Sequence, residues 1–192
     1  MKDFNVRDQV AQAAVELFAE KGYANTSVQE VVERAGVTKG AMYHYYRSKD
    51  DLLFGIYERM LTLQREHLDE IVARGLPTTE TLRTACIDVV ETSIDALPEG
   101  TVFFRSVHML SPERQQEVTR RRRAYNDVFA GIITRGQAEG SYRDDIPIAV
   151  LVANFFSDVH YLSNWYSPTG AESKTRVAEQ LTDLFLKGIE AT

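Results

Sequence analysis

Residues 26–50 read TSVQEVVERAGVTKGAMYHYYRSKD, and this stretch decides the fold. Apolar residues recur at helical spacing over 28–35 and predict a short helix that ends at Gly36. Thr38 is a suitable N-cap for a second short helix over 39–45. Glycine adopts the left-handed backbone that a tight turn between helices needs. The stretch therefore predicts a helix-turn-helix.

The second helix of this motif carries the residue types that a DNA-reading helix needs. It begins with Lys39, Gly40 and Ala41, two of them small enough to allow close approach to base edges. It continues with Tyr43 and His44, which can form hydrogen bonds. A recognition helix directs its N-terminal turn at the bases of the major groove, and its flanks meet the phosphates. The alternative is a small helical module whose tyrosines only pack.

Charge is distributed unevenly along the chain. The 22 Lys+Arg and 28 Asp+Glu give a formal net charge of −6, which argues against binding nucleic acid through bulk charge. Residues 34–49, however, contain four Lys or Arg, one His and no Asp or Glu. Lys49 also begins the next predicted helix, where a cation beside free backbone amides can bind a phosphate. The motif is thus a basic patch in an acidic protein.

Helical spacing continues through the rest of the chain, and no segment alternates apolar and polar residues as a strand does. We assign residues 1–48 to an N-terminal three-helix domain with the helix-turn-helix at about 27–46. Residues 49–192 are predicted to form a second, larger helical domain. The sequence thus predicts an all-α chain of nine helices, over residues 6–21, 28–35, 39–45, 49–74, 79–97, 99–110, 112–139, 147–166 and 172–190.

Composition excludes several classes of protein. The one cysteine, Cys86, excludes a disulfide scaffold and a cysteine-rich zinc site, and we expect no metal and no cofactor. With 44% hydrophobic and 26% charged residues, wholesale disorder is excluded. No apolar stretch approaches the roughly 20 residues of a membrane span, and no signal-peptide core follows the N-terminus. We therefore expect a soluble, cytoplasmic protein with no membrane partner.

The sequence contains no recognisable catalytic set. The four histidines, at positions 44, 67, 108 and 160, are scattered, and no Glu-x-x-His motif of a di-iron bundle occurs. We expect the protein not to be an enzyme. Two alternatives stay open, a helical enzyme and a protein-binding adaptor, each with a vestigial helix-turn-helix. Steep salt dependence of binding to a palindromic duplex would separate a DNA-binding regulator from both.

Between Arg7 and Leu53 the chain resembles the TetR (tetracycline-repressor) family of bacterial transcriptional regulators. The resemblance rests on Leu17-Phe18, Gly22-Tyr23, Thr26-Ser27-Val28, Ala35-Gly36-Val37-Thr38-Lys39-Gly40, Met42-Tyr43-His44-Tyr45-Tyr46 and Ser48-Lys49-Asp50. It implies a homodimer that binds a double-stranded DNA operator. It further implies base contacts from Lys39, Gly40 and Ala41, and phosphate contacts from Thr26, Ser27, Thr38, Tyr43, His44 and Lys49.

The same resemblance implies that residues 49–192 are an effector-binding and dimerisation domain. Its last two helices are then expected to pair with those of a second subunit. The predicted helix over 147–166 is apolar nearly all round, which favours burial on more than one face. The helix over 172–190 has one apolar stripe. The alternative is that both serve only the core of one chain. We predict a dimer interface that includes Leu151, Phe155, Val159, Val177, Leu181, Leu184 and Phe185.

Residues 103–109 and 154–166 are loosely similar to TetR-family members that respond to acyl-CoA thioesters of fatty-acid or steroid breakdown. This similarity implies a ligand-responsive repressor that a small lipophilic effector releases from DNA, with an acyl-CoA as the expected class. The basic run over 120–123 is then either a solvated surface or a source of contacts to an anionic ligand. The predicted ligand-binding residues are Phe103, Phe104, Arg105, His108, Met109, Arg123, Phe156, Asn164 and Trp165.

Overall fold

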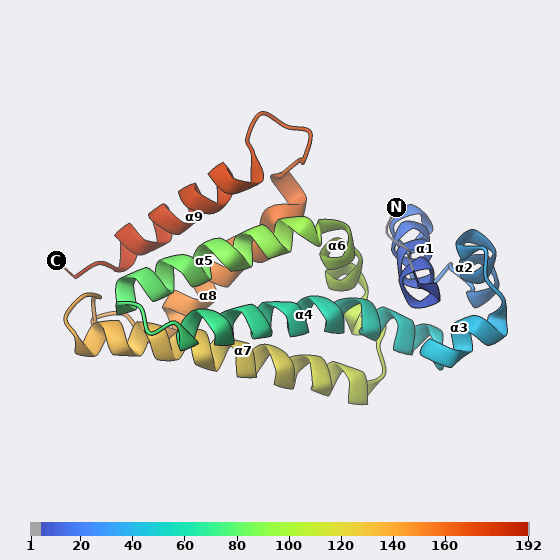
Figure 1. Ribbon diagram of the computed structural model, residues 1–192, viewed down its shortest axis with the longest axis horizontal. Helices are drawn as coiled ribbons and strands as arrows, with labels where there is room; N and C mark the ends of the chain where they lie inside the picture. The colour runs from blue at the N-terminus through green and yellow to red at the C-terminus, as the bar shows by residue number, and fades with distance from the viewer. Residues whose placement is uncertain (1–4, 192) are drawn as a thin grey trace. The chain divides into compact units, whose positions relative to one another are not determined.

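The computed structural model describes residues 5–191, and within that range the chain forms nine α-helices (Figure 1). One 3-10 turn, Val107–Met109, and one isolated bridge between Tyr142 and Glu190 complete its secondary structure. The predicted all-α class is confirmed. The helices are α1 (Val6–Lys21), α2 (Val28–Ala35), α3 (Lys39–Tyr45), α4 (Lys49–Ala73), α5 (Thr78–Asp95), α6 (Leu97–Ser106), α7 (Pro112–Ala138), α8 (Ile148–Trp165) and α9 (Lys174–Ile189).

Helices α2 and α3 have the bounds that the sequence predicts because the signals that set them are local. The Ser27 hydroxyl accepts a hydrogen bond from the Glu30 amide at 3.2 Å, and the Glu30 carboxylate accepts one from the Ser27 amide at 2.8 Å. These two reciprocal hydrogen bonds form a capping box. Gly36 ends α2 in the left-handed region with φ of 67°. The Thr38 hydroxyl caps α3 by accepting the Ala41 amide at 3.1 Å.

Helix α6 departs from its predicted range of 99–110. It begins at Leu97 and contains Pro98 in its first turn, where the missing N–H costs no helical hydrogen bond. It ends at Ser106, and the next three residues tighten into the 3-10 turn. The break between α5 and α6 is therefore at Ala96, two residues before the proline that predicts it.

The chain forms two compact units that do not coincide with the predicted boundary at residue 48. Unit 1 comprises the chain up to Arg59 together with Pro98–Val118. Unit 2 comprises Met60–Leu97 and the chain from Thr119 onward. Helices α4 and α7 each contribute residues to both units. Part of the expected effector domain is thus folded with the helix-turn-helix.

Each unit has its own apolar core. In unit 1, α1, α2 and α3 contact one another, and the rings of Tyr57 and Phe103 stack with centroids 3.5 Å apart. In unit 2, α5 contacts α8 and α9, and Phe129 lies among the rings of Phe155 and Phe156. No helix among the described residues is long and apolar enough to cross a membrane.

Candidate functional site

Helix α3 presents one face to the interior of unit 1 and the other to solvent. Met42 and Tyr46 are buried, at 0% and 2% exposure, and hold the helix to the core. Lys39, Gly40, Tyr43 and His44 are exposed, and Ala41 is half-buried. Among residues 5–191, the Lys39 ammonium has no partner. All five residues of α3 that the sequence predicts to contact DNA are thus at least partly accessible to solvent.

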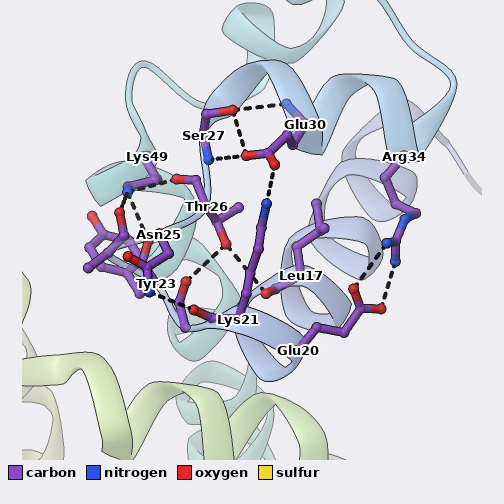
Figure 2. A network of polar contacts seen from close by, with 12 residues as sticks. Leu17, Glu20, Lys21, Tyr23, Asn25, Thr26, Ser27, Glu30, Arg34 and Lys49 are labelled. Carbon is purple, nitrogen blue, oxygen red and sulfur yellow. Dashed lines mark hydrogen bonds and ion pairs between the residues drawn. The ribbon is translucent and has the colours of Figure 1, made fainter.

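The basic patch is less basic in the structure than in the sequence. The Arg34 guanidinium pairs with both carboxylate oxygens of Glu20, at 3.0 and 3.1 Å, and with Glu16 at 3.4 Å. Lys21 forms an ion pair with Glu30, and this pair together with Ser27 lowers the pKa of the Glu30 carboxyl to about 2 (Figure 2). Because Arg34 is paired with carboxylates, the positive charge of the patch lies mainly on Lys39, on α3, and on Arg47, just after it.

Lys49 contacts the backbone of its own chain. Its ammonium donates to the backbone carbonyls of Tyr23 and Thr26, each at 2.9 Å, and lies 3.5 Å from that of Ala24 (Figure 2). It also lies 4.4 Å from the centroid of the Tyr23 ring. Partial burial lowers the pKa of Lys49 from its ordinary value. The lysine therefore joins the first turn of α4 to the loop between α1 and α2, a structural role that the sequence does not predict.

The predicted phosphate contact of Thr26 disagrees with the position of its side chain. Its side chain is buried at 2% exposure, and its hydroxyl donates to the Gly22 carbonyl at 3.0 Å. A buried hydroxyl with a backbone acceptor cannot reach a phosphate, so Thr26 closes the loop that Lys49 binds. The hydroxyls of Ser27 and Thr38 serve as helix caps but remain on exposed residues.

Replacing Lys49 with methionine should destabilise the protein rather than weaken DNA binding alone. The variant keeps most of the apolar stem and removes the ammonium, so the Tyr23 and Thr26 carbonyls both lose a hydrogen bond, and the Tyr23 carbonyl keeps only the Thr26 amide at 3.3 Å. We expect the free energy of unfolding to fall by about 1–3 kcal/mol. Urea unfolding followed by circular dichroism measures this. Lys39→Met is the matched control, and its exposed site should change stability by less than about 0.5 kcal/mol. Unchanged stability in Lys49→Met would contradict this structural role of the ammonium.

The predicted effector residues are divided between the two units. Phe103 and Phe104 lie in unit 1, where Phe103 is fully buried against Tyr57. Three further predicted residues of unit 1, and two at the end of α8, are exposed: Arg105, His108, Met109, Asn164 and Trp165. Two of the nine, Arg123 and Phe156, line one groove of unit 2.

That groove is formed by α7 and α8 within unit 2. It is open to solvent, has a volume of about 620 Å³, and is lined on its apolar side by Ile148, Val152 and Phe156. Arg122 and His160 also line it, and an Arg122 nitrogen lies 3.4 Å from both ring nitrogens of His160. Burial, and then Arg122, lower the pKa of His160 to about 4. The histidine is therefore a neutral hydrogen-bonding group at neutral pH.

The predicted dimer interface is corrected at most of its positions. Five of its seven residues are buried in the core of their own chain, because α8 and α9 pack on each other and on α5. They are Leu151, Phe155, Val159, Val177 and Phe185. Leu181 is partly buried against the same core, and Leu184 is 72% exposed. The large apolar residues that α8 and α9 expose are Val150, Tyr161, Trp165 and Leu184, which we call the α8/α9 apolar face.

Comparison with protein families places these features in a known group. Residues 11–56 match the model of bacterial regulatory proteins of the tetR family, and residues 75–189 match the tetracyclin repressor-like C-terminal domain. The chain belongs to the TetR family. Because members of this family are transcriptional regulators, the prediction that the protein is not an enzyme is confirmed.

Individual members of the family resemble the chain over nearly its whole length. The transcriptional repressor KstR2 of Rhodococcus jostii is 28% identical over 186 residues, which cover 95% of this chain and 90% of that one. A TetR/AcrR-family regulator of Thermobifida fusca is 33% identical, with a TM-score of 0.74 and coverage of 95% and 97%. AibR, solved in complex with isovaleryl coenzyme A and operator DNA, has a TM-score of 0.78 at 21% identity, with coverage of 97% and 98%.

Proposed function

We propose that this protein is a transcriptional repressor that binds a palindromic DNA operator as a homodimer and leaves it when a small effector binds. The observation that carries the proposal is the exposed face of α3, with Lys39 and Gly40 at its first turn and Met42 and Tyr46 anchoring its back. Such a helix can enter a major groove, where its first turn contacts base edges. In that position, Tyr43 and His44 would contact the flanking phosphates.

The α8/α9 apolar face supports dimer formation. Its four residues are between 52% and 72% exposed in the single chain. Isolated exposed apolar residues are ordinary, but several large ones on adjoining helices favour an interface. A two-fold dimer would bury the same face on both subunits and would give two copies of α3, one for each half of a palindrome. Their separation should match one turn of DNA, roughly 34–36 Å, or a multiple of it.

The groove of α7 and α8 is the proposed effector site. Its apolar side suits a short acyl group, and Arg123 at its edge suits a phosphate, since guanidinium binds phosphate through paired hydrogen bonds. Neutral His160 can contribute a hydrogen bond to the ligand. An acyl-CoA combines an acyl group with several phosphates. The complex of AibR, a protein of the same fold, with isovaleryl coenzyme A supports this class of ligand.

Release requires that the effector prefer the conformation with low affinity for DNA. A ligand that binds both conformations equally shifts nothing, however tightly it binds. A shift from mostly bound to mostly released requires a preference of several kcal/mol, roughly 5.5 for a complete reversal. Binding to the groove and release from DNA are therefore separate measurements, and only a compound that produces both is the effector.

The test begins with duplexes that the wild-type protein selects from a random library, and titrates their complexes with short-chain acyl-CoA thioesters and the matching free acids. We expect an inverted repeat among the selected duplexes and release by the thioesters alone. Arg123→Gln should raise the thioester concentration for half-release by about tenfold, because it removes one charge-assisted hydrogen bond to the ligand. Arg176→Gln on α9 is the control, since Arg176 pairs with Glu172 at an exposed site.

Three outcomes would contradict parts of this proposal. Failure of the wild-type protein to enrich any duplex would overturn the DNA-binding function. Equal release by the free acids would remove the case for phosphate contacts. Release by thioesters that Arg123→Gln leaves unchanged would move the effector site away from the groove.

A further inference from the structure

The end of α3 is fitted closely against α4 in unit 1. Tyr46, the C-cap residue of α3, lies with its ring over Gly55 of α4. A Cβ atom added at Gly55 would lie 2.8 Å from the Tyr46 Cε1 atom, so the glycine makes the space that the ring occupies. The Tyr46 side chain is 2% exposed. The position of α3 is thus tied to the first turns of α4.

The next residue is held by a carboxylate of α4. The Arg47 backbone N–H donates to Asp51 Oδ2 at 3.0 Å, and the Asp51 N–H donates to the Ser48 hydroxyl at 2.9 Å. These two hydrogen bonds fix the short connection between α3 and α4. Asp51 therefore fixes the backbone conformation directly after the proposed recognition helix.

The same carboxylate is held from the other side by a residue far away in sequence. Arg114 of α7 forms an ion pair with Asp51 Oδ1, and its guanidinium carbon lies 4.2 Å from the centroid of the Phe54 ring. The neighbouring Asp50 accepts the Ser111 N–H at 2.9 Å, so the start of α7 contacts α4 at two carboxylates. The Asp51 side chain is only 21% exposed, which reduces screening of the ion pair by water.

We propose that Arg114 is a positioning residue for DNA recognition, acting through Asp51 on the backbone at Arg47. The guanidinium keeps the carboxylate aligned with the Arg47 N–H, and Asp51 in turn keeps the connection after α3 in one conformation. The inference rests on the proposed function of α3. It adds that the first turn of α7, outside the helix-turn-helix, determines how precisely α3 is presented to DNA. The same helix α7 supplies Arg122 and Arg123 of the groove.

The first test is hydrogen exchange at the Arg47 amide, which needs no DNA. Arg114→Gln should raise its exchange rate by about tenfold, because the acceptor carboxylate loses the group that aligns it. Arg114→Lys keeps a cation at the site and should restore much of the protection. Arg83→Gln, which removes an exposed ion pair with Asp183 in unit 2, is the matched control and should change nothing at Arg47. Unchanged exchange in Arg114→Gln would overturn the proposal.

The second test is a double-mutant cycle on DNA affinity. Arg114→Gln and Asp51→Asn should each weaken binding to the duplex that the wild-type protein selects by about tenfold, and their combination should weaken it no further. Affinity for a random-sequence duplex should change little, since misalignment affects base contacts more than phosphate contacts. Additive losses, or equal losses on both duplexes, would overturn the positioning role. A wild-type protein that selects no duplex would instead overturn the proposed function, and the exchange test would still stand.

Discussion

Leu184→Arg is expected to convert the dimer into monomers and to weaken binding to a palindromic operator by at least about a hundredfold. Leu184 is 72% exposed on α9 and belongs to the α8/α9 apolar face. In a two-fold dimer the substitution occurs twice in one interface, so two charges lose water without gaining a partner. A monomer also loses the advantage of binding two linked half-sites, which is worth about 10²–10⁴ in affinity.

Sedimentation at micromolar concentration, together with binding to a full palindrome and to a half-site, measures both effects. Leu63→Arg is the matched control, because Leu63 is an exposed apolar residue of α4, at 45% exposure, outside the proposed face. The control should remain a dimer with wild-type affinity for DNA. A wild-type protein that sediments as a monomer, or a Leu184→Arg variant that remains a dimer, would contradict the proposed interface.

Local signals explain why the helix-turn-helix could be predicted from the sequence. Ser27, Gly36 and Thr38 each act on backbone groups within a few residues, through a capping box, a left-handed turn and an N-cap. Their effect does not depend on the rest of the fold. The predicted bounds of α2 and α3 therefore agree with the structure. Pro98, in contrast, is compatible both with the end of one helix and with the first turn of the next, and the predicted choice is wrong.

The partners of polar side chains could not be predicted in the same way. Lys49 binds carbonyls that precede it by 23 to 26 residues, and Asp51 binds a guanidinium 63 residues later. A lysine at the start of a helix is equally suited to a phosphate and to a carbonyl. Only the folded chain shows that the loop after α1 brings carbonyls to this ammonium.

Apolar residues present a related problem in α8. The helix is apolar nearly all round, and this pattern indicates burial on more than one side without saying which neighbour covers each residue. Phe155 faces the core of its own chain, whereas Tyr161 on the same helix is 62% exposed. Likewise, the sequence predicts Phe103 as a ligand-binding residue, whereas in the structure it is fully buried and its ring stacks on that of Tyr57. Assignment of core, pocket and interface depends on contacts between helices distant in sequence.

The recognition helix offers the second large effect. Lys39→Ala should weaken binding to the duplex that the wild-type protein selects by about 1–3 kcal/mol and should relax base preference at one position in each half-site. The reason is its place in the first turn of α3, where its ammonium is exposed and has no partner among residues 5–191. The adjacent Gly40 and Ala41 cannot replace the lysine at a base edge, since their side chains form no hydrogen bonds.

Fluorescence anisotropy with the selected duplex and a random-sequence duplex measures the change in affinity, and a repeated selection with the variant measures the change in preference. Lys187→Ala removes an exposed cation from the last turn of α9 and is the control for net charge. If Lys39 contacts a base, affinity should fall more for the selected duplex than for the random one. An equal fall for both would make Lys39 a phosphate contact, because contacts to the backbone carry no sequence information. Wild-type affinity and an unchanged selected sequence would show that α3 does not read bases through this residue.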